Sequence, residues 1–322
     1  MSRLSNTRSI DSYLDSLLTQ RKLSGHTIAG YGNDLGQLTE FAQDTEFASL
    51  THAQIRQFAS RLHANGLSAR SIARKLSAWR GFFQWLAEQT GNTVNPVDGI
   101  RPPRRAATLP KALSVDDAVR LVASNPPGTL QEKAPASEPD LCDRAMFELL
   151  YSSGLRVSEL VGLDIHYVQQ PGYASQGWLD MDTHEVTVLG KGGKTRIVPV
   201  GEHAINAIKA WLSVRNQPGE SAISDSDRHA LFISSRKHRI SPRSVQLRLK
   251  AHAQSLGIPV NVHPHVLRHS FASHILQSSG DLRAVQEMLG HSSIASTQVY
   301  TSLDFQHLAK VYDSAHPRAR KK

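Results

Sequence analysis

The sequence has a single cysteine, Cys142, among its 322 residues. One cysteine cannot form an intramolecular disulfide, and a zinc site built from several cysteines is not expected either. No stretch approaches the roughly 18 consecutive apolar residues of a membrane-spanning helix, and residues 1–18 lack the apolar core of a signal peptide. We therefore expect a cytoplasmic protein that does not insert into a membrane.

Acidic residues are missing from two long stretches, residues 47–87 and 228–280, although both stretches are rich in basic side chains. Over the whole chain 37 Lys and Arg stand against 28 Asp and Glu, which gives a net charge of +9. Such an excess favours a polyanionic partner, most often nucleic acid. One acid-free stretch lies in each half of the chain, so the pattern predicts two basic surfaces that clamp a polyanion. The simpler alternative is two solvated faces whose acids lie elsewhere.

The length of the chain predicts two domains, and its apolar content of 39% suffices for packed cores. In the first domain, apolar residues at helical spacing predict four helices, at about residues 10–18, 27–41, 51–64 and 68–88. The apolar stripe of the fourth helix is expected in the core, whereas its Arg and Lys residues fall on other faces. Four short helices with a basic side are typical of a DNA-binding bundle. Residues 101–112 contain three prolines and predict an extended linker.

The second domain is predicted to be mostly helical, with one small antiparallel sheet. Residues 124–140 are polar and rich in proline, and they predict a loop. Strands are expected at 178–181, 185–189 and 195–198, the last two joined by a glycine-rich turn at 190–194. Helices are expected from residue 114 and at about 141–152, 157–163, 202–214, 241–255, 265–277, 281–289 and 303–312.

Several short motifs of this domain could carry chemistry, and each is weak alone. His265 and His269 have the i, i+4 spacing of two metal ligands, but the helix predicted around them has no carboxylate to complete a site. The turn GKGGK at 190–194 lacks the spacing of a nucleotide-binding loop. The motifs are, in chain order, GLRVSEL with Arg156, GKGGK with Lys191, HVLR with His265 and Arg268, LGH with His291, and Tyr300 nine residues later.

Together and in this order, the motifs resemble those of the tyrosine recombinase (λ integrase) family, most closely the Xer recombinases of bacterial chromosomes. The resemblance covers nearly the whole chain, although residues 124–140 and 173–178 are longer than is usual in the family. It implies a mainly α fold. Residues 1–100 would be a four-helix, SAM-like core-binding domain that clamps DNA. Residues 101–112 would be the linker, and residues 113–322 a catalytic domain of the DNA breaking-rejoining fold, helical with a small antiparallel sheet.

The resemblance further implies phosphoryl transfer through a covalent 3′-phosphotyrosine, without metal, ATP or another cofactor. Arginine suits the binding of an anionic phosphodiester because it donates bidentately and keeps its charge. Lys194 lies in the same turn as Lys191 and could replace it, and Glu159 is expected to orient a catalytic neighbour. Six side chains would carry the reaction: Arg156 and Arg268 as phosphate ligands, Lys191 as general acid, His265 as proton acceptor, His291 as a donor to the phosphate, and Tyr300 as nucleophile.

The expected partners are double-stranded DNA with a dif-like recombination site, a XerD-type recombinase in a heterotetramer, and a cell-division DNA translocase. The apolar stripe of residues 301–322 suits docking into a neighbouring subunit, although this segment could instead cap its own domain. Five basic side chains on predicted helices are the candidates for DNA contact: Arg70, Arg74, Lys75, Arg243 and Arg248.

Three alternatives remain open from the sequence. The chain could be a phage or integron integrase, or a type IB topoisomerase that relaxes DNA without a specific site. It could be a DNA-binding protein without catalytic activity, although such a protein has no need of the nucleophile. It could also be a histidine-metal hydrolase, which the missing carboxylates disfavour.

Overall fold

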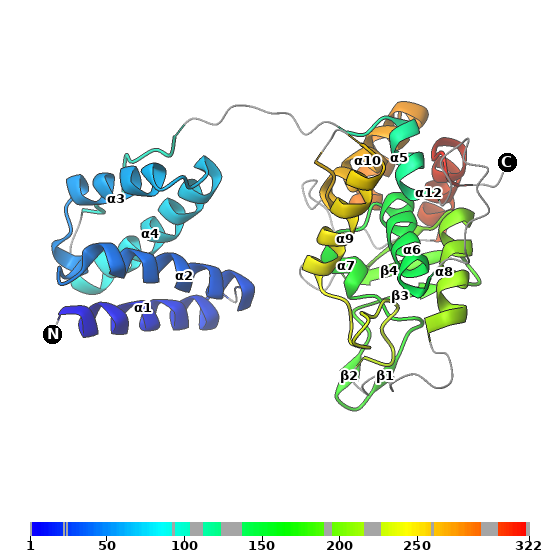
Figure 1. Ribbon diagram of the computed structural model, residues 1–322. Helices are drawn as coiled ribbons and strands as arrows, with labels where there is room; N and C mark the ends of the chain where they lie inside the picture. The colour runs from blue at the N-terminus through cyan, green and yellow to red at the C-terminus, as the bar shows by residue number, and fades with distance from the viewer. Residues whose placement is uncertain are drawn as a thin grey trace. The chain divides into compact units, whose positions relative to one another are not determined.

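The computed structural model describes residues 2–21, 23, 25–91, 94–103, 112–123, 137–189, 195–215, 227–258, 261–290 and 302–319. The chain divides into two compact units, Met1–Thr108 and Leu109–Lys322. Figure 1 draws the first unit in blue to cyan and the second in green to red. The predicted fold is confirmed: the first unit is a bundle of helices, and the second is mostly helical with a small antiparallel sheet.

The N-terminal unit consists of α1 (Ser2–Thr19), α2 (Gly25–Ala42), the 3₁₀ turn η1 (Phe47–Ser49), α3 (His52–Ala64) and α4 (Ala69–Thr90). A capping box starts α3: the Thr51 hydroxyl accepts from the Gln54 backbone, and the Gln54 side chain accepts from the Thr51 backbone at 2.9 Å. The apolar stripe of α4 lies in the core, as predicted, and Trp79 and Phe82 are fully buried there.

A buried carboxylate joins α2 to α4 inside this bundle. Asp34 is inaccessible to solvent and accepts from Arg74 at 2.5 and 2.8 Å and from the Lys75 ammonium at 2.9 Å. Its backbone oxygen also accepts from the indole of Trp79 at 2.8 Å. Because a buried charge is costly unless it is paired and hydrogen-bonded, these contacts fix the register between the two helices.

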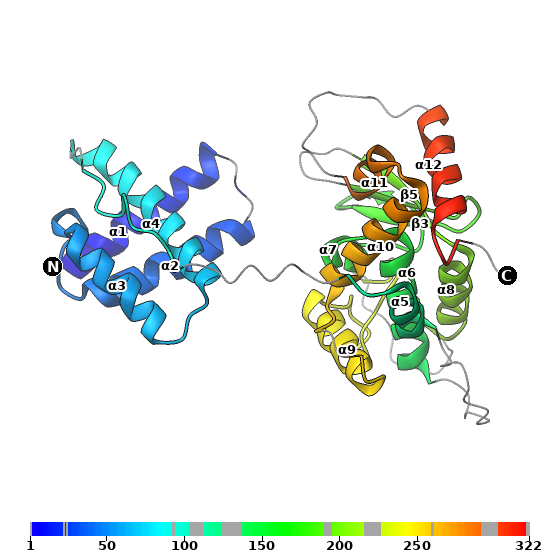
Figure 2. The same ribbon diagram turned by 90° about the horizontal axis from the view of Figure 1, so that it is seen from above.

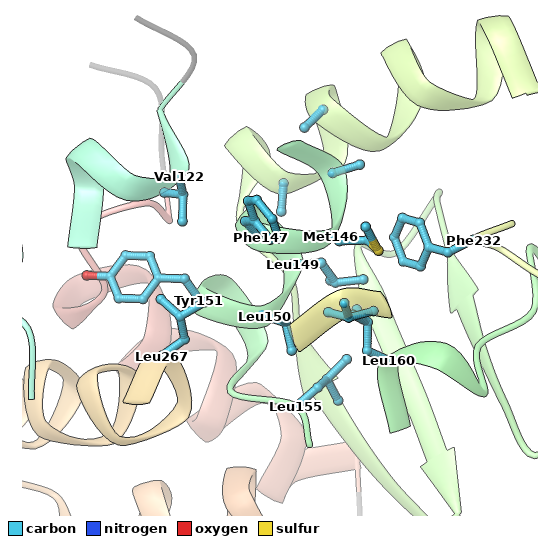
Figure 3. Close-up of a cluster of buried hydrophobic side chains, with 14 of the residues drawn as sticks. Val122, Met146, Phe147, Leu149, Leu150, Tyr151, Leu155, Leu160, Phe232 and Leu267 are labelled. Carbon is cyan, nitrogen blue, oxygen red and sulfur yellow. The ribbon is translucent and has the colours of Figure 1, made fainter. Parts of the chain in front are cut away.

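The C-terminal unit is arranged around α6 (Glu138–Ser153), which is buried along most of its length. A helix that is apolar on nearly all faces belongs inside a domain. Figure 3 shows its side chains Met146, Leu149 and Leu150 among residues from several other elements. The surrounding helices are α5 (Val115–Val122), α7 (Val157–Val161), α8 (Glu202–Arg215), α9 (Pro242–Ser255), α10 (Pro264–Ser279), α11 (Leu282–Leu289) and α12 (Ser302–Ala315).

The sheet has the strand order β3-β4-β5, with β3 (Gly177–Asp180), β4 (Glu185–Leu189) and β5 (Thr195–Pro199) antiparallel. Two differences from the sequence predictions stand out. Residues 138–140 belong to α6 rather than to the loop, because Ser137 and Asp140 form a capping box that starts the helix there. A second, two-stranded sheet joins β1 (Gln169–Gln170) to β2 (Tyr173–Ala174), and no pattern in the sequence predicts it.

Helix α12 packs against its own domain, beside α10 and α11 (Figure 2). Leu308 and Tyr312 are buried in a cluster that includes Phe271. The Tyr312 hydroxyl lies 2.6 Å from the hydroxyl of Ser152 on α6. Leu308 and Tyr312 therefore cap their own domain. Their apolar surface is not available to a neighbouring subunit.

Candidate active site

Arg156 stands at the N-terminus of α7, where the chain turns sharply out of α6. Gly154 ends α6 with a left-handed φ of 59°, and Arg156 is the N-cap of α7 in an extended conformation. Glu159 closes this turn, because its carboxylate accepts from both the backbone and the guanidinium of Arg156, each at 2.8 Å. The Arg156 side chain keeps 39% of its surface exposed, so part of its guanidinium faces solvent.

Glu159 is shared with a second arginine. Arg196 of β5 is buried and donates to both carboxylate oxygens, at 2.9 and 2.7 Å. Burial alone would raise the pKa of Glu159, but the hydrogen bonds and charges of Arg196 and Arg156 lower it to about 2. Glu159 is therefore ionised at every working pH and orients both guanidinium groups.

Arg268 lies on α10 and is directed by main-chain oxygens. It is 8% exposed, and it donates to the carbonyls of Gly154 at 2.6 Å and Leu289 at 2.5 Å. Burial and the positive charges of Arg156 and Arg196 together lower its pKa to about 10, and the negative charge of Glu159 opposes them. Arg268 is therefore still protonated at neutral pH.

The described part of the site thus places three guanidinium groups around one carboxylate. Three positive charges against one negative charge leave an excess of positive charge beside a surface that Arg156 opens to solvent. Planar, permanently charged donors of this kind match the oxygens of a phosphate. The arrangement can bind an anionic phosphodiester and stabilise the additional charge that develops on it during nucleophilic attack.

His265 lies one helical turn before Arg268, in the first turn of α10. Its side chain is exposed, and its ring centroid is 6.1 Å from that of His263, the N-cap of the helix. A histidine in this position can exchange protons with solvent or with a bound substrate. Within the described ranges, no three His, Cys, Asp or Glu side chains come together as a metal-binding group.

Lys191, Lys194, His291 and Tyr300 lie outside the described residues. The elements that flank them are described, and two of these reach the arginine cluster. Strand β5, which follows residues 190–194 in the chain, carries Arg196. Helix α11, which precedes His291, ends at Leu289, whose carbonyl accepts from Arg268.

Arg196 is the residue of this cluster that the sequence analysis did not assign to the site. The pattern of β5 contains the missing signal: Arg196 and Val198 are buried, while Thr195 and Ile197 are exposed. An arginine at an inward position of an alternating strand needs a buried acceptor, and Glu159 is that acceptor.

The five candidates for DNA contact differ in their surroundings. Arg70 and Arg243 are exposed near the starts of α4 and α9. Arg248 pairs with Asp143 at 2.9 Å, and Arg74 pairs with Asp34. Lys75 is buried against the same Asp34, so its ammonium is not placed to meet a phosphate; here the geometry disagrees with the interpretation from sequence.

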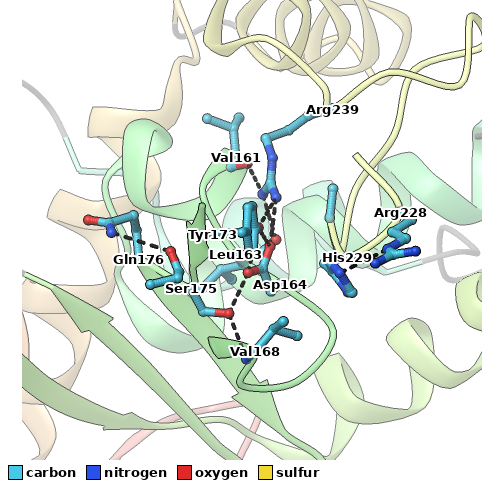
Figure 4. A network of polar contacts seen from close by, with 12 residues as sticks. Val161, Leu163, Asp164, Val168, Tyr173, Ser175, Gln176, Arg228, His229 and Arg239 are labelled. Carbon is cyan, nitrogen blue, oxygen red and sulfur yellow. Dashed lines mark hydrogen bonds and ion pairs between the residues drawn. The ribbon is translucent and has the colours of Figure 1, made fainter. Parts of the chain in front are cut away.

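A second buried carboxylate, Asp164, anchors the unpredicted β1–β2 hairpin (Figure 4). It is inaccessible to solvent and accepts from Tyr173 at 2.7 and 2.8 Å, from Ser175 at 2.6 Å and from Arg239 at 2.6 Å. Arg239 also donates to the carbonyls of Val161, the last residue of α7, and Leu163, two residues later. The network fixes the chain just beyond the helix that begins at the arginine cluster.

Comparisons with known proteins place this chain in a family. Residues 128–307 match the Phage integrase family, and residues 10–90 match the family's N-terminal SAM-like domain. The chain is 56% identical over 319 residues to "Tyrosine recombinase XerC 1" of Ralstonia nicotianae, covering 97% of this chain and 94% of the relative. It is 46% identical over 299 residues to "Tyrosine recombinase XerC" of Chromobacterium violaceum, covering 93% and 91%.

Solved structures show the same fold at lower identity. The Tn1549 transposon integrase in complex with transposon right end DNA aligns with a TM-score of 0.65 at 16% identity, over 94% of this chain and 98% of that one. The XerH recombinase bound to a palindromic difH substrate aligns with a TM-score of 0.63 at 20% identity, over 91% and 81%. Within the described residues, none of the helices combines the length and apolar character needed to cross a membrane.

Proposed function

This chain belongs to the phage integrase family and is a site-specific tyrosine recombinase, and from that premise we propose that it acts as a XerC-type enzyme in chromosome dimer resolution. Its substrate would be a dif-like site in double-stranded DNA. The observation that carries the proposal is the cluster of Arg156, Arg268 and Arg196 around Glu159, which suits an anionic phosphodiester.

In the proposed reaction, the phenolic oxygen of Tyr300 attacks the scissile phosphorus while His265 accepts the phenol proton. The bond from phosphorus to the 5′-oxygen breaks, and Lys191 protonates that oxygen, which leaves as a 5′-hydroxyl. Arg156, Arg268 and His291 stabilise the charge on the five-coordinate phosphorus. The 3′-phosphotyrosine retains the energy of the phosphodiester bond, so that a 5′-hydroxyl of the partner DNA can attack it and restore the strand without ATP or a metal ion.

The N-terminal unit would clamp the duplex together with the catalytic unit, and contacts to phosphates would supply most of the affinity and its salt dependence. A XerD-type recombinase would complete a heterotetramer, and a cell-division DNA translocase would act with it. Support for these partners comes from the curated relatives: this chain matches them over nearly their full length, and they are named XerC.

A nicked suicide DNA that carries the candidate site tests the chemistry. Incubated with this protein in EDTA and without nucleotide, it should give a covalent adduct that withstands denaturation. Tyr300→Phe should give none, and Tyr167→Phe, which alters an exposed tyrosine on another part of the domain, should react like the wild type. An adduct that persists in Tyr300→Phe would refute the mechanism.

The partner is tested in the same assay. Adding the XerD-type recombinase of the same cell should raise cleavage and allow strand exchange between two sites. Complete recombination by this protein alone would contradict the heteromeric proposal. Relaxation of supercoiled DNA that lacks the site would instead favour the topoisomerase alternative.

A further inference from the structure

The contacts of Arg196 connect three segments that carry catalytic motifs. Its Nη1 and Nη2 donate to the two carboxylate oxygens of Glu159, and its Nε donates to the carbonyl of Met288 at 3.1 Å. Glu159 is at the start of α7 with Arg156, Met288 is near the end of α11, and Arg196 comes shortly after the GKGGK motif at 190–194 in the sequence. One buried side chain thus joins all three.

The close approach of Gly290 shows how tightly Arg196 is enclosed. A Cβ atom at Gly290 would lie 2.9 Å from Cδ of Arg196, and Gly290 has a left-handed φ of 64° that ends α11. The absence of a side chain at 290 therefore leaves the room that the arginine side chain occupies, one residue before His291 in the sequence.

We infer that Arg196 is a positioning residue for strand cleavage: it occupies Glu159 from the buried side and thereby leaves the outer edge of Arg156 for the scissile phosphate. This inference rests on the proposed function of the site. It assigns to Arg196 no contact with DNA, because only 5% of its surface is exposed.

The reason is a competition for one carboxylate. With Arg196 present, both oxygens of Glu159 accept from the guanidinium of Arg196, and the side chain of Arg156 donates to Glu159 through Nη1. Without Arg196, a carboxylate that is only 10% exposed would remain with one cation, and the favourable response is a bidentate pair that turns Arg156 inward. The carbonyl of Met288 would also lose its donor at the end of α11.

Lysine cannot replace arginine here. The three contacts need three donors in a planar, fork-shaped arrangement, and an ammonium group is a single point charge on a flexible stem. Arg196→Lys therefore keeps the charge and nearly the volume but loses the geometry, which makes it the more informative of two variants. Arg196→Met removes the charge as well.

The test measures two quantities on the suicide DNA: the single-turnover rate of adduct formation and the Kd for the half-site. Arg196→Met and Arg196→Lys should each lower the rate by about 30-fold or more, as expected for lost hydrogen bonds to a charged group, with Kd changed by less than about threefold. Adding Glu159→Gln to either variant should raise the rate again, because glutamine no longer draws Arg156 inward.

A merely structural role predicts the opposite for the double variant, since a second lesion would add to the first. Arg239→Met is the matched control: it also takes a guanidinium from a buried carboxylate, Asp164, and should lower the melting temperature but leave the cleavage rate of bound protein unchanged. If Arg196→Met does not fold, the comparison of Arg196→Lys with the double variant Arg196→Lys, Glu159→Gln tests the inference. Wild-type rates in Arg196→Lys, or a slower double variant, overturn the inference, whereas a wild type that forms no adduct overturns the proposed function itself.

Discussion

A methyl group on Gly154 would lie 2.8 Å from Cε1 of Phe271, and closer still to Cδ1. Gly154 also has a φ of 59°, a left-handed conformation that residues other than glycine adopt at a cost of roughly 1–2 kcal/mol. Gly154→Ala should therefore lower the free energy of unfolding by about 3 kcal/mol, because overpacking adds to the backbone cost. Urea denaturation of the full chain measures the change.

Gly172→Ala is the matched control for that variant. Gly172 has a φ of 79°, but a Cβ atom there would meet nothing within 4 Å. Its cost should be about 1 kcal/mol, from the backbone alone. Equal losses in the two alanine variants would show that the contact with Phe271 relaxes without cost.

Lys75 and Arg70 lie five residues apart on α4 and should behave differently in DNA binding. Lys75→Met removes a buried partner of Asp34 and should cost about 2 kcal/mol of stability without changing the salt dependence of DNA affinity. Arg70→Met alters an exposed side chain. If Arg70 contacts a phosphate, this change should reduce the magnitude of the slope of log K against log salt by about one. Titrations of half-site DNA at several salt concentrations measure both slopes. A lower slope for Lys75→Met would mean that its ammonium reaches the DNA.

His316 should make the catalytic unit less stable in mild acid. Its ring is buried and held neutral: Nε2 donates to the Tyr151 carbonyl at 3.1 Å, and Nδ1 accepts from the Arg318 backbone at 3.1 Å. Burial lowers its pKa to about 3, so below the unfolded pKa of about 6.5 only the unfolded chain takes up this proton. The stabilisation is complete above pH 6.5 and should fall by about 2 kcal/mol between pH 7 and pH 5.

His316→Gln is the comparison variant, because glutamine can donate and accept but does not titrate. It should be less stable than the wild type at pH 7 and lose less stability on going to pH 5. Burial also lowers the pKa of His274, so a smaller acid dependence should remain in the variant. Parallel curves for the two proteins would mean that His316 is protonated in the folded state.

The residues of the network around Asp164 should contribute unequally to the free energy of unfolding. Asp164→Asn leaves the guanidinium of Arg239 beside a neutral group and should cost about 3–5 kcal/mol, as expected when a buried ion pair loses one partner. Tyr173→Phe removes one hydrogen-bond donor from the same carboxylate and should cost about 1 kcal/mol. Urea denaturation at pH 7 ranks the two variants. A larger loss for Tyr173→Phe would show that the hairpin, rather than the charge pair, carries the stability.

Local patterns in the sequence were enough for most helices and for the strands of the main sheet. The capping pair Thr51 and Gln54 marks the start of α3, and the alternation in 195–198 marks β5. The β1–β2 hairpin escaped prediction because its paired residues, among them Gln169 and Gln170, have no β-branched side chains and no alternation. Its stability comes from Asp164, a contact that no local pattern contains.

The candidate site was predictable where a motif carries it and unpredictable where two distant side chains meet. Arg156 and Arg268 stand in motifs that can be read directly. The pairing of Glu159 with Arg196 joins residues 37 positions apart, and the pairing of Asp34 with Lys75 joins residues 41 positions apart. Charge in the sequence shows that cations are present, but only the packing of helices and strands decides which carboxylate each one meets.

Arg156 and Arg268, the two arginines proposed as phosphate ligands, differ in what a mutation must remove to release them. Arg156 depends on the carboxylate of Glu159, which a change of one codon removes. Arg268 is held by the main-chain oxygens of Gly154 and Leu289, and every amino acid supplies a carbonyl at those positions. Its direction is therefore encoded in the course of the backbone. No substitution removes either acceptor. As long as helices α6 and α11 end where they do now, Arg268 keeps its orientation even when the side chains around it are substituted.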